Sequence, residues 1–290
     1  MANSKDFLFR SKGNVEEFVT DFSENYTSKK DTQEEFQKQI ERLRQLQGML
    51  YAQGKHGLLI ILQAMDAAGK DGVVKHVMSG VNPQGCKVVS FKAPSTKELA
   101  HDYMWRCLKE MPERGHIGIF NRSYYEEVLI ARIHPSLLVR QNLPFYCKNM
   151  SEDFAFWEQR FEDIVNIEKY YANNGYIILK FFLNLSADEQ KRRFLSRIEN
   201  PVKNWKFEMS DISERQYWAK YRHAYQDMLV NTDHAKAPWY VIPADKKWYM
   251  RLAISRIIVE KLETLKLSYP KVSKKHLEDI ELARRILEKE

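Results

Sequence analysis

The sequence lacks the features of membrane, secreted and metal-cluster proteins. Among its 290 residues no apolar run approaches the roughly 20 residues that a membrane helix needs, so we expect no membrane-spanning segment. The first residues contain no apolar signal core, which favours a cytoplasmic location. Three cysteines are present, at positions 86, 107 and 147, and their spacing is unpaired. This argues against a disulfide framework and against a zinc site.

Several catalytic signatures are also missing. The sequence has no Gly-x-Ser-x-Gly motif of the kind that positions a nucleophilic serine. Its eight histidines are scattered without the spacing of metal ligands, so we expect His76, His101 and His116 to be structural or surface residues. There is no internal repeat and no low-complexity tract. Serine hydrolases, His/Cys metal sites and repeat architectures are therefore disfavoured.

The composition is that of a globular protein with an anionic partner. Hydrophobic residues make up 44% and charged residues 29%, and 46 basic residues against 39 acidic ones leave a net charge of +7. An excess of positive charge favours a polyanion, and nucleic acid, an anionic membrane and polyphosphate all fit it. Aromatic residues make up 12%, but they fall inside apolar helix and strand patterns rather than beside basic runs. Stacking of single-stranded nucleic acid is therefore disfavoured.

The stretch Gly57–Gly72, GLLIILQAMDAAGKDG, organises the rest of the chain. Its aliphatic run Leu58–Leu62 predicts a strand buried on both faces, and the small residues that follow predict a tight loop. From Lys70 a helical pattern runs to about Gly80. A strand, a tight loop, a lysine and a helix form the layout of a phosphate-binding loop, in which backbone N–H groups and the lysine hold phosphate oxygens.

The loop departs from the usual G-x-x-x-x-G-K-[ST] pattern at two positions. Ala64 replaces the first glycine, and Asp71 stands where a Ser or Thr would meet Mg²⁺. Asp66 lies inside the loop, where a carboxylate among phosphates needs an intervening cation, so we interpret it as a magnesium-organising residue. The alternative is a tight turn whose acidic residues stabilise a helix N-terminus. That alternative accounts for Asp66 and Asp71 but does not account for Lys70.

Strands and helices alternate along the chain. The pattern predicts five strands, over 58–62, 87–91, 116–120, 176–185 and 239–242. Helices are expected over 31–51, 70–80, 97–110, 123–133, 149–172, 186–199, 211–229 and about 245–267, with an irregular arm over 1–30, a loop over 135–144 and a short charged helix from 273. Strands that are apolar throughout and alternate with helices predict a parallel sheet covered on both faces.

Polar residues at the starts of three helices predict N-terminal caps. Ser95 precedes Glu98 by three residues, and Ser186 precedes Glu189 by the same distance, which is the spacing of a capping box. Either the aspartate at 31 or the threonine at 32 is expected to cap the first long helix.

Ligands of parallel α/β sheets bind at the carboxyl ends of the strands. This rule gathers five segments in one site, at 66–70, 91–92, 121–122, 184 and 243–247. Arg122, directly after a strand, suits phosphate because its planar guanidinium group grips two oxygens. Asn121 could hold a metal-bound water. Glu126 and Glu127 could serve the site or only stabilise a helix N-terminus.

A basic helix followed by a basic segment with a proline break is typical of a lid in small-molecule kinases. The cations of this region are Lys191, Arg192, Arg193, Arg197, Lys203 and Lys206. The alternative is a solvated helix face, which charge runs of this kind usually form. Because the charge continues beyond the break at Asn200 and Pro201, a lid that folds over the phosphate loop is favoured.

Four segments, taken together, resemble the polyphosphate kinase 2 family. They are QAMDAAGKDG at 63–72, IFNRSYYEEVLIARIHP at 119–135, FFLNLSADEQKRRFLSRIENPVKNWKF at 181–207 and APWYVIPADKKWYMRLAISRII at 237–258. The resemblance implies an α/β, three-layer α/β/α P-loop kinase fold, thymidylate-kinase-like, with a parallel five-stranded sheet, a helical lid and an N-terminal helical extension. It further implies an N-terminal arm and helix packed on the core (1–56), a P-loop kinase domain (57–270) with its lid at about 186–212, and a C-terminal helical tail (271–290).

The resemblance also implies a Mg²⁺-dependent cytoplasmic phosphotransferase. Such an enzyme moves the terminal phosphate of inorganic polyphosphate to AMP or ADP, reversibly, and commonly forms a homodimer or homotetramer, with neither nucleic acid nor a membrane as partner. Asp66, Lys70 and Arg122 match the catalytic positions, and Arg192 or Arg193 matches the lid arginine. Asn121, where other members have Asp, resembles the class III subgroup, which accepts both AMP and ADP.

The remaining site residues follow from the same resemblance. The expected phosphate- and polyphosphate-binding residues are Ala67, Ala68, Gly69, Lys70, Asp71, Gly72, Lys75, Lys87 and Lys92. Those expected to bind nucleotide are Asn121, Arg122, Glu126, Arg132 and Lys206, and those expected to bind metal are Asp66 and Asn121. Two alternatives stay open: an ATP-dependent nucleoside or nucleotide kinase of the same fold, and a basic P-loop protein that binds nucleic acid without catalysis.

Overall fold

The structure, a computed structural model, describes residues 3–10, 13–145, 147 and 149–290. Its centre is a five-stranded sheet in which all neighbouring strands are parallel, in the order β2-β3-β1-β4-β5. The strands are β1 (Gly57–Gln63), β2 (Cys86–Ser90), β3 (Ile117–Asn121), β4 (Tyr176–Asn184) and β5 (Trp239–Pro243). All five expected strands are confirmed, and their ends differ by one residue at most from those predicted.

The central strand β1 is buried along its whole length. Because successive side chains of a strand point to opposite faces of the sheet, Leu58, Ile60 and Leu62 enter the core on one face. Leu59 and Ile61 enter the core on the other face. The continuous aliphatic run therefore encodes a strand that is covered on both sides.

The strand β2 is an edge strand, and the expectation that every strand is buried on both faces was wrong for it. The side chains at 87, 88 and 90 are exposed. Lys87 forms an ion pair with Glu110, with 2.6 Å between Nζ and Oε2. A strand with one neighbour tolerates such charges, and they discourage pairing with a further strand.

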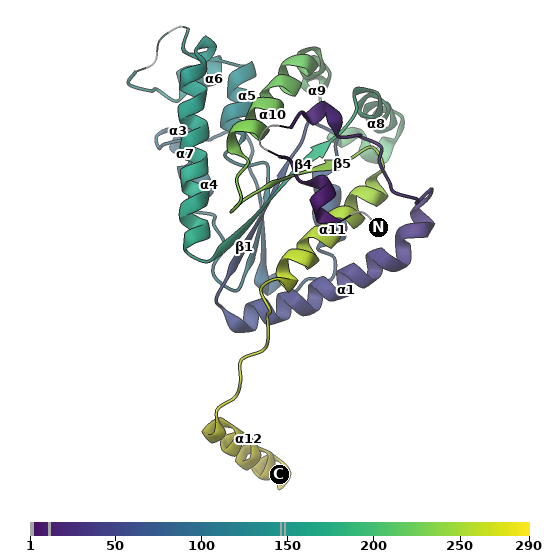
Figure 1. Cartoon of the computed structure of the whole chain (residues 1–290), viewed down its shortest axis with the longest axis vertical. Coiled ribbons are helices and arrows are strands. Elements are labelled where there is room, and N and C mark those ends of the chain that lie inside the picture. Colours follow the sequence, from purple (N-terminus) through teal and green to yellow (C-terminus); the bar gives the residue numbers. More distant parts are fainter. Residues whose placement is uncertain (1–2, 11–12, 146, 148) are drawn as a thin grey trace.

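Helices cover both faces of the sheet, which gives the expected three layers (Figure 1). One face carries α1 (Lys29–Gln53), α2 (Lys70–Val77) and α11 (Lys247–Glu263), and the other carries α5 (Glu126–Ile133), α7 (Phe154–Asn173) and α10 (Trp218–Thr232). The long helix α1 lies along α11. The sheet is thus held between two apolar cores, and its carboxyl edge is left for a site.

The N-terminal cap of α1 is Ser28, three residues before the first of the two predicted caps. The hydroxyl of Ser28 donates to the carboxylate of Asp31 at 2.9 Å, and the Ser28 backbone N–H donates to the same carboxylate at 2.8 Å. With the N–H of Thr27, these bonds lower the pKa of Asp31 to about 2. Ser28 is therefore the cap, and the aspartate and threonine predicted for that role lie in the first turn. The helix ends at Gly54, whose φ of +62° favours glycine.

Three predicted helices or loops are divided differently. The helix expected over 97–110 is two short ones, α3 (Thr96–Leu99) and α4 (Trp105–Leu108), because the carboxylate of Asp102 accepts the N–H groups of Met104 and Trp105 and starts a new turn. The capping box of Ser95 and Glu98 is confirmed. The loop expected over 135–144 contains α6 (Ser136–Arg140), and the helix expected over 211–229 is α9 (Met209–Glu214), a 3₁₀ turn and α10.

The basic segment of the expected lid forms α8 (Ala187–Glu199) and a 3₁₀ turn at 201–206. The hydroxyl of Ser186 caps α8 by accepting the N–H of Glu189. The reciprocal bond of a capping box, which was expected from the side chain of Glu189, is absent. That carboxylate instead accepts hydrogen bonds from Arg192 and Arg193.

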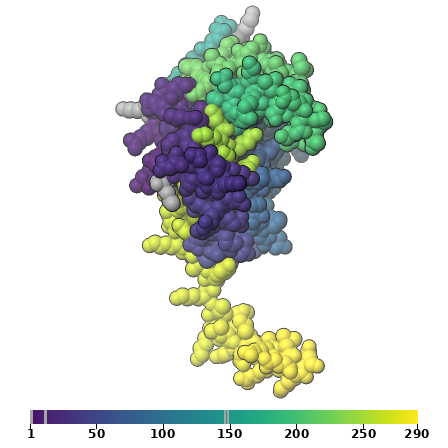
Figure 2. All heavy atoms as spheres, turned by 90° about the vertical axis from the view of Figure 1, so that its right-hand side faces the viewer, coloured from purple at the N-terminus to yellow at the C-terminus, as the bar shows by residue number. Residues whose placement is uncertain are grey.

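The ends of the chain behave differently from each other. The described part of the arm expected over 1–30 packs against β5, where the N–H of Phe9 donates to the carbonyl of Trp239 at 2.8 Å; residues 1–2 and 11–12 of that arm lie outside the described residues. At the other end α12 (Lys274–Leu287) stands away from the body on an extended segment (Figures 1 and 2). Within the described residues no helix combines the length and the apolar character needed to cross a membrane.

Candidate active site

The loop between β1 and α2 is a compact turn with an inward-facing lysine. Gly69 caps α2 with a φ of +112°, and Ala67 takes a φ of +62°, so the chain reverses sharply there. The ammonium of Lys70 donates to the carbonyl of Ala64 at 2.8 Å. Burial and the charge of nearby Arg122 lower the pKa of Lys70, while Asp66 opposes this. A phosphate in the loop would raise the pKa of this lysine again, because an adjacent negative charge favours the ammonium form.

Arg193 binds the backbone carbonyls of the phosphate loop. Its guanidinium donates to the carbonyls of Ala67 and Ala68 at 2.9 and 2.7 Å, and to those of Ala244 and Asp245 at 2.6 and 3.0 Å. Its side chain is 4% exposed. Arg193 therefore ties the loop after β1 to the segment after β5.

The neighbouring arginine has a different role. Arg192 is 70% exposed and pairs only with Glu189 among the described residues, at 2.6 Å. Both arginines line the same cavity. The two candidates for a lid arginine thus differ in the structure: Arg193 is buried and bonded to the loop, and Arg192 is exposed and paired with Glu189 at the surface.

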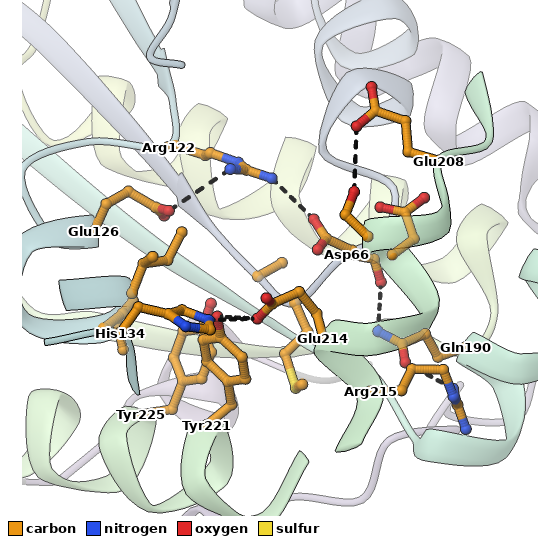
Figure 3. A pocket seen from close by; sticks show the side chains of 16 residues that line it. Asp66, Arg122, Glu126, His134, Gln190, Glu208, Glu214, Arg215, Tyr221 and Tyr225 are labelled. Atoms are coloured by element: carbon orange, nitrogen blue, oxygen red, sulfur yellow. Dashed lines mark hydrogen bonds and ion pairs between the residues drawn. The ribbon is translucent and has the colours of Figure 1, made fainter. Parts of the chain in front are cut away.

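Arg122 connects the loop to α5. Its backbone lies in the left-handed region, with a φ of +64°, which costs a residue with a side chain roughly 1–2 kcal/mol. Its N–H donates to the carbonyl of Leu62 at 3.1 Å, which fixes this bend. The guanidinium donates to Asp66 at 2.9 Å and lies 3.8 Å from the carboxylate of Glu126 (Figure 3). Burial raises the pKa of Glu126.

A cavity of about 730 Å³, here called the loop cavity, opens at the carboxyl edge of the sheet. Its walls come from the phosphate loop, β3, α8, the 3₁₀ turn after it and the start of α11. Ten cationic residues line it: Lys70, Lys92, Arg122, Arg192, Arg193, Arg197, Lys203, Lys206, Lys247 and Arg251. Three acidic residues do so: Asp66, Asp71 and Glu208. An excess of positive charge in a concave surface concentrates anions.

A second cavity of about 300 Å³, here called the lid cavity, lies between α5, α9 and α10 (Figure 3). Five acidic residues line it: Asp66, Glu126, Glu208, Asp211 and Glu214. Its other walls include Leu129, Ile130, His134, Tyr221 and Tyr225. Aromatic and aliphatic walls with a few polar groups are typical of a site for a ring-containing ligand.

One cluster of contacts closes the lid cavity. The carboxylate of Glu214 accepts the hydroxyl of Tyr221 at 2.7 Å and lies 3.0 Å from Nε2 of His134 (Figure 3). On the loop side, the amide of Gln190 donates to the carbonyl of Asp66 at 2.9 Å. The two cavities share Asp66, Arg122 and Glu208 as a common wall. A third, more apolar cavity of about 390 Å³ adjoins this wall at Arg122 and contains Phe91, Leu99 and Leu137.

Most of the predicted site residues lie together. The loop cavity contains Asp66, Ala67, Ala68, Gly69, Lys70, Asp71, Gly72, Lys92, Asn121, Arg122, Arg192, Arg193 and Lys206. Glu126 lines the lid cavity. The amide of Asn121 donates to the carboxylate of Asp71 at 2.9 Å. The segments at 66–70, 91–92 and 121–122, which the strand-end rule gathered, thus line one cavity.

Four expected residues are placed elsewhere. Arg132 forms an ion pair with Asp227 at 2.6 Å and lies over two aromatic rings, outside the three cavities described above. Lys87, on the edge strand β2, forms an ion pair with Glu110. Lys75 is exposed on α2. Asn184 is buried, and its amide donates to the carbonyl of Phe18. The structure therefore does not bring these four side chains into the loop cavity or the lid cavity, because residue type and spacing do not show which way a side chain points.

Sequence reasoning missed part of both cavities. Arg251 on α11 lines the loop cavity and was not expected there, whereas Lys247, four residues before it, ends the segment 243–247 that the strand-end rule placed in the site. Burial and the adjacent Arg193 lower the pKa of Lys247 to about 8. Tyr221 and Tyr225, also four apart on a helix, line the lid cavity. In each case spacing of four on one helix face was the available signal.

The acidic residues fit Mg²⁺ only in part. Among the described residues no cluster of three or more His, Cys, Asp or Glu side chains could hold a metal by itself. Mg²⁺ bound with phosphates needs one or two carboxylates, the rest of its ligands being phosphate oxygens and water. Asp66, one-third exposed on the shared wall, meets that requirement.

The fold and these cavities define a class of protein. A phosphate loop at the carboxyl edge of a three-layer parallel α/β sheet, with a basic lid, is the arrangement of a P-loop phosphotransferase. Residues 26–270 match the sequence model of the polyphosphate kinase 2 (PPK2) family. The chain belongs to that family, and the P-loop kinase fold expected for it is confirmed.

Similar proteins carry descriptive names. The chain is 52% identical over 250 residues to the ADP-polyphosphate phosphotransferase of Rhodopseudomonas palustris, covering 86% of this chain and 85% of that protein. It is 45% identical over 229 residues to the AMP/ADP-polyphosphate phosphotransferase of Meiothermus ruber, covering 79% and 80%. The crystal structure of polyphosphate kinase 2 from Arthrobacter aurescens matches with a TM-score of 0.87 at 35% identity, covering 97% of this chain and 96% of that one.

Proposed function

We propose that this protein transfers the terminal phosphate of inorganic polyphosphate to AMP or ADP, reversibly. The observation that carries the proposal is the pair of cavities with opposite character that meet at Asp66 and Arg122. The loop cavity, with ten cations, suits a chain-like polyanion. The lid cavity, with aromatic and apolar walls, suits a nucleotide that carries its own phosphate to the shared wall. The names of the two similar phosphotransferases support the same substrates.

The transfer needs positioning and charge more than covalent chemistry by the protein. An oxygen of the acceptor nucleotide's last phosphate forms a bond to the terminal phosphorus of polyphosphate. The bridging P–O bond to the rest of the chain breaks, which leaves a chain one phosphate shorter. The attacking oxygen is already ionised at neutral pH, so no general base is required. Lys70 and Arg122 stabilise the charge on the transferring group, and Arg192 meets the chain from the lid.

The proposal includes one Mg²⁺ site. Asp66 would hold Mg²⁺, with Asn121 beside it as a second oxygen donor. Bound there, Mg²⁺ supplies neutralisation of the phosphate charges on both sides of the shared wall. In the structure Arg122 donates to Asp66, so a metal held by Asp66 would share that carboxylate with the arginine.

The finer assignments belong to the same proposal. Asn121 supports use of both AMP and ADP, because an amide adds no negative charge beside the acceptor phosphate. We also propose the division into 1–56, 57–270 with the lid at about 186–212, and 271–290. Within the proposal the enzyme acts in the cytoplasm as a homodimer or homotetramer, and neither nucleic acid nor a membrane is its partner.

A single incubation tests the proposal. The protein is mixed with Mg²⁺, long-chain polyphosphate and AMP in the absence of ATP, and ADP and ATP are followed by chromatography. Formation of both products is the expected result, and EDTA should abolish it. If ATP forms from ADP but nothing forms from AMP, the assignment of Asn121 fails and polyphosphate use stands. If neither nucleotide is phosphorylated unless ATP is supplied as donor, the protein is an ATP-dependent kinase. If it binds nucleic acid tightly and phosphorylates nothing, the assignment as an enzyme fails.

A further inference from the structure

Three successive carbonyls of the phosphate loop accept hydrogen bonds from side chains of α8. Gln190 donates to the carbonyl of Asp66 at 2.9 Å. Arg193, three residues further along the helix, donates to the carbonyls of Ala67 and Ala68 at 2.9 and 2.7 Å. Residues three apart lie on the same face of a helix. One face of α8 thus holds the backbone of the loop at Asp66 and the two residues after it.

The bond from Gln190 fixes the direction of one peptide group. In a planar trans peptide, the carbonyl of one residue and the N–H of the next point in opposite directions. Because the carbonyl of Asp66 is turned toward Gln190, the N–H of Ala67 is turned away from it. Loops of this kind bind phosphate oxygens through backbone N–H groups, and a carbonyl oxygen in their place would repel the anion. Rotation of this peptide would therefore weaken the site.

The amide of Gln190 has a second partner, on another segment. Its Oε1 accepts a hydrogen bond from the guanidinium of Arg215 at 2.7 Å, and the same guanidinium donates to the carbonyl of Ala187 at 3.2 Å. Arg215 begins the 3₁₀ turn after α9 and lines the lid cavity (Figure 3). Gln190 is only 3% exposed. One buried amide thus connects the phosphate loop with a wall of the lid cavity.

Glutamine is the residue type that suits both partners. The carbonyl of Asp66 can only accept a hydrogen bond, and the guanidinium of Arg215 can only donate one. The amide of Gln190 meets both needs, because it carries an NH₂ donor and a carbonyl acceptor. A carboxylate in its place would keep the bond to the arginine and set an acceptor against the carbonyl. An apolar side chain would lose both bonds and leave buried polar groups without their partner, which is costly.

We propose that Gln190 is a positioning residue that fixes the backbone of Asp66 and ties it to Arg215. The inference rests on the proposed function, in which Asp66 holds Mg²⁺ beside the transferring phosphate. Movement of this backbone would displace the carboxylate of Asp66 and the N–H of Ala67 together. A displacement of about 1 Å can cost a reaction about 100-fold in rate. The main effect is therefore on kcat, because the affinity for polyphosphate comes from the many cations of the loop cavity.

Steady-state kinetics with polyphosphate and ADP tests the role in catalysis. Gln190→Met keeps the length of the side chain and loses both bonds, and it is expected to lower kcat about tenfold while KM for polyphosphate changes less than about threefold. Gln190→Glu keeps the acceptor for Arg215 and loses the donor for Asp66, and it is expected to lower kcat by a similar factor. Gln216→Met, at an exposed glutamine of the 3₁₀ turn after α9, is the matched control and should retain wild-type kcat.

Hydrogen–deuterium exchange tests the positioning without any substrate. Backbone N–H groups over 63–72 are expected to exchange several-fold faster in both Gln190 variants than in the wild type, and no faster in Gln216→Met. Exchange over the core strand β4 is the internal reference for folding and should be unchanged. If Gln190→Met exchanges faster there as well, Gln190→Glu, which has the shape of the native side chain, decides the result. A wild-type enzyme that transfers no phosphate would refute the proposed function, and exchange over 63–72 would still decide whether Gln190 holds the loop.

Two results would overturn the proposal. One is wild-type exchange over 63–72 in both Gln190 variants, which would mean that Arg193 holds the loop without help from Gln190. The other is wild-type kcat in Gln190→Glu, since the donor to Asp66 would then be dispensable and the bond to Arg215 would be the one that matters.

Discussion

The loop cavity and the lid cavity share a wall, yet the charges of the residues that line them differ. In the loop cavity cations outnumber acids ten to three, and half of the cations are exposed to solvent. In the lid cavity five acids lie among two tyrosines and apolar side chains, and Glu214 accepts a hydrogen bond from Tyr221 in the same wall. A cavity of the first kind binds any dense polyanion through its field. A cavity of the second kind binds through shape and a few polar contacts, so it can select a nucleotide.

The two lid arginines make the same contrast on a smaller scale. Arg193 and Arg192 are adjacent in sequence, but one is buried under the phosphate loop and the other points to solvent. Neighbours on a helix are separated by about 100°, so one helix can hold the loop with one side chain and present the next to a ligand. In this site Arg193 holds the loop, and under the proposed function Arg192 binds the polyphosphate.

Removal of Lys70 should have the largest effect on catalysis. Lys70→Ala is expected to lower kcat at least about 100-fold, because under the proposed function this loop lysine stabilises the charge on the transferring phosphate. Lys75→Ala, on the same helix but exposed and outside both cavities, is the matched control and should retain activity. Steady-state kinetics with polyphosphate and ADP measures both. Substantial turnover by the Lys70 variant would contradict the assignment of the phosphate loop.

Substitution of the two arginines should affect different quantities, the free energy of unfolding for Arg193 and the KM for polyphosphate for Arg192. Arg193→Ala is expected to lower the free energy of unfolding by about 3 kcal/mol, because four loop carbonyls and the carboxylate of Glu189 lose their buried partner. Arg192→Ala should change that free energy by less than about 0.5 kcal/mol and should raise KM for polyphosphate instead. Urea unfolding and kinetics on both variants provide the measurements. Equal effects of the two variants on stability would remove the distinction.

The loop cavity should lose affinity as the pH rises. Burial lowers the pKa of Lys247 to about 8, so this residue is charged below that pH and becomes neutral above it. The value of kcat/KM for polyphosphate should therefore fall several-fold as pH rises through about 8, since this quantity reports ionisation in the free enzyme. Lys247→Arg should move the fall to higher pH. A fall at the same pH in both enzymes would assign it to another group.

Salt should affect the two substrates unequally. Raising ionic strength from about 0.05 to 0.3 M should increase KM for polyphosphate several-fold, because its binding rests on the field of exposed cations. The KM for AMP should change less, because the lid cavity relies on shape and apolar contact. Initial-rate measurements at four salt concentrations compare the two slopes. Equal slopes would mean that the cavities do not divide the substrates as proposed.

Local sequence patterns predicted a large part of this arrangement. The aliphatic run of β1 and the loop that ends in Lys70 were predicted because their signals lie within one short segment. The strand-end rule then brought Asn121 and Arg122 to the same cavity without any contact information. By contrast, the sequence did not show that Asp102 would divide a helix, since a capping side chain competes with the helix only in its final geometry.

By itself, the sequence determined the order of strands and helices, the phosphate loop between β1 and α2, and the positive character of the site. Those features depend on periodicity, on small residues and on net charge, which are local or additive. Only the tertiary structure decided that Arg132 turns to Asp227, that Arg193 is the clamp and Arg192 the exposed partner, and that a second cavity lies beside the first. Those outcomes depend on which distant segment packs against each side chain, because burial and pairing are properties of the folded chain rather than of any stretch of it.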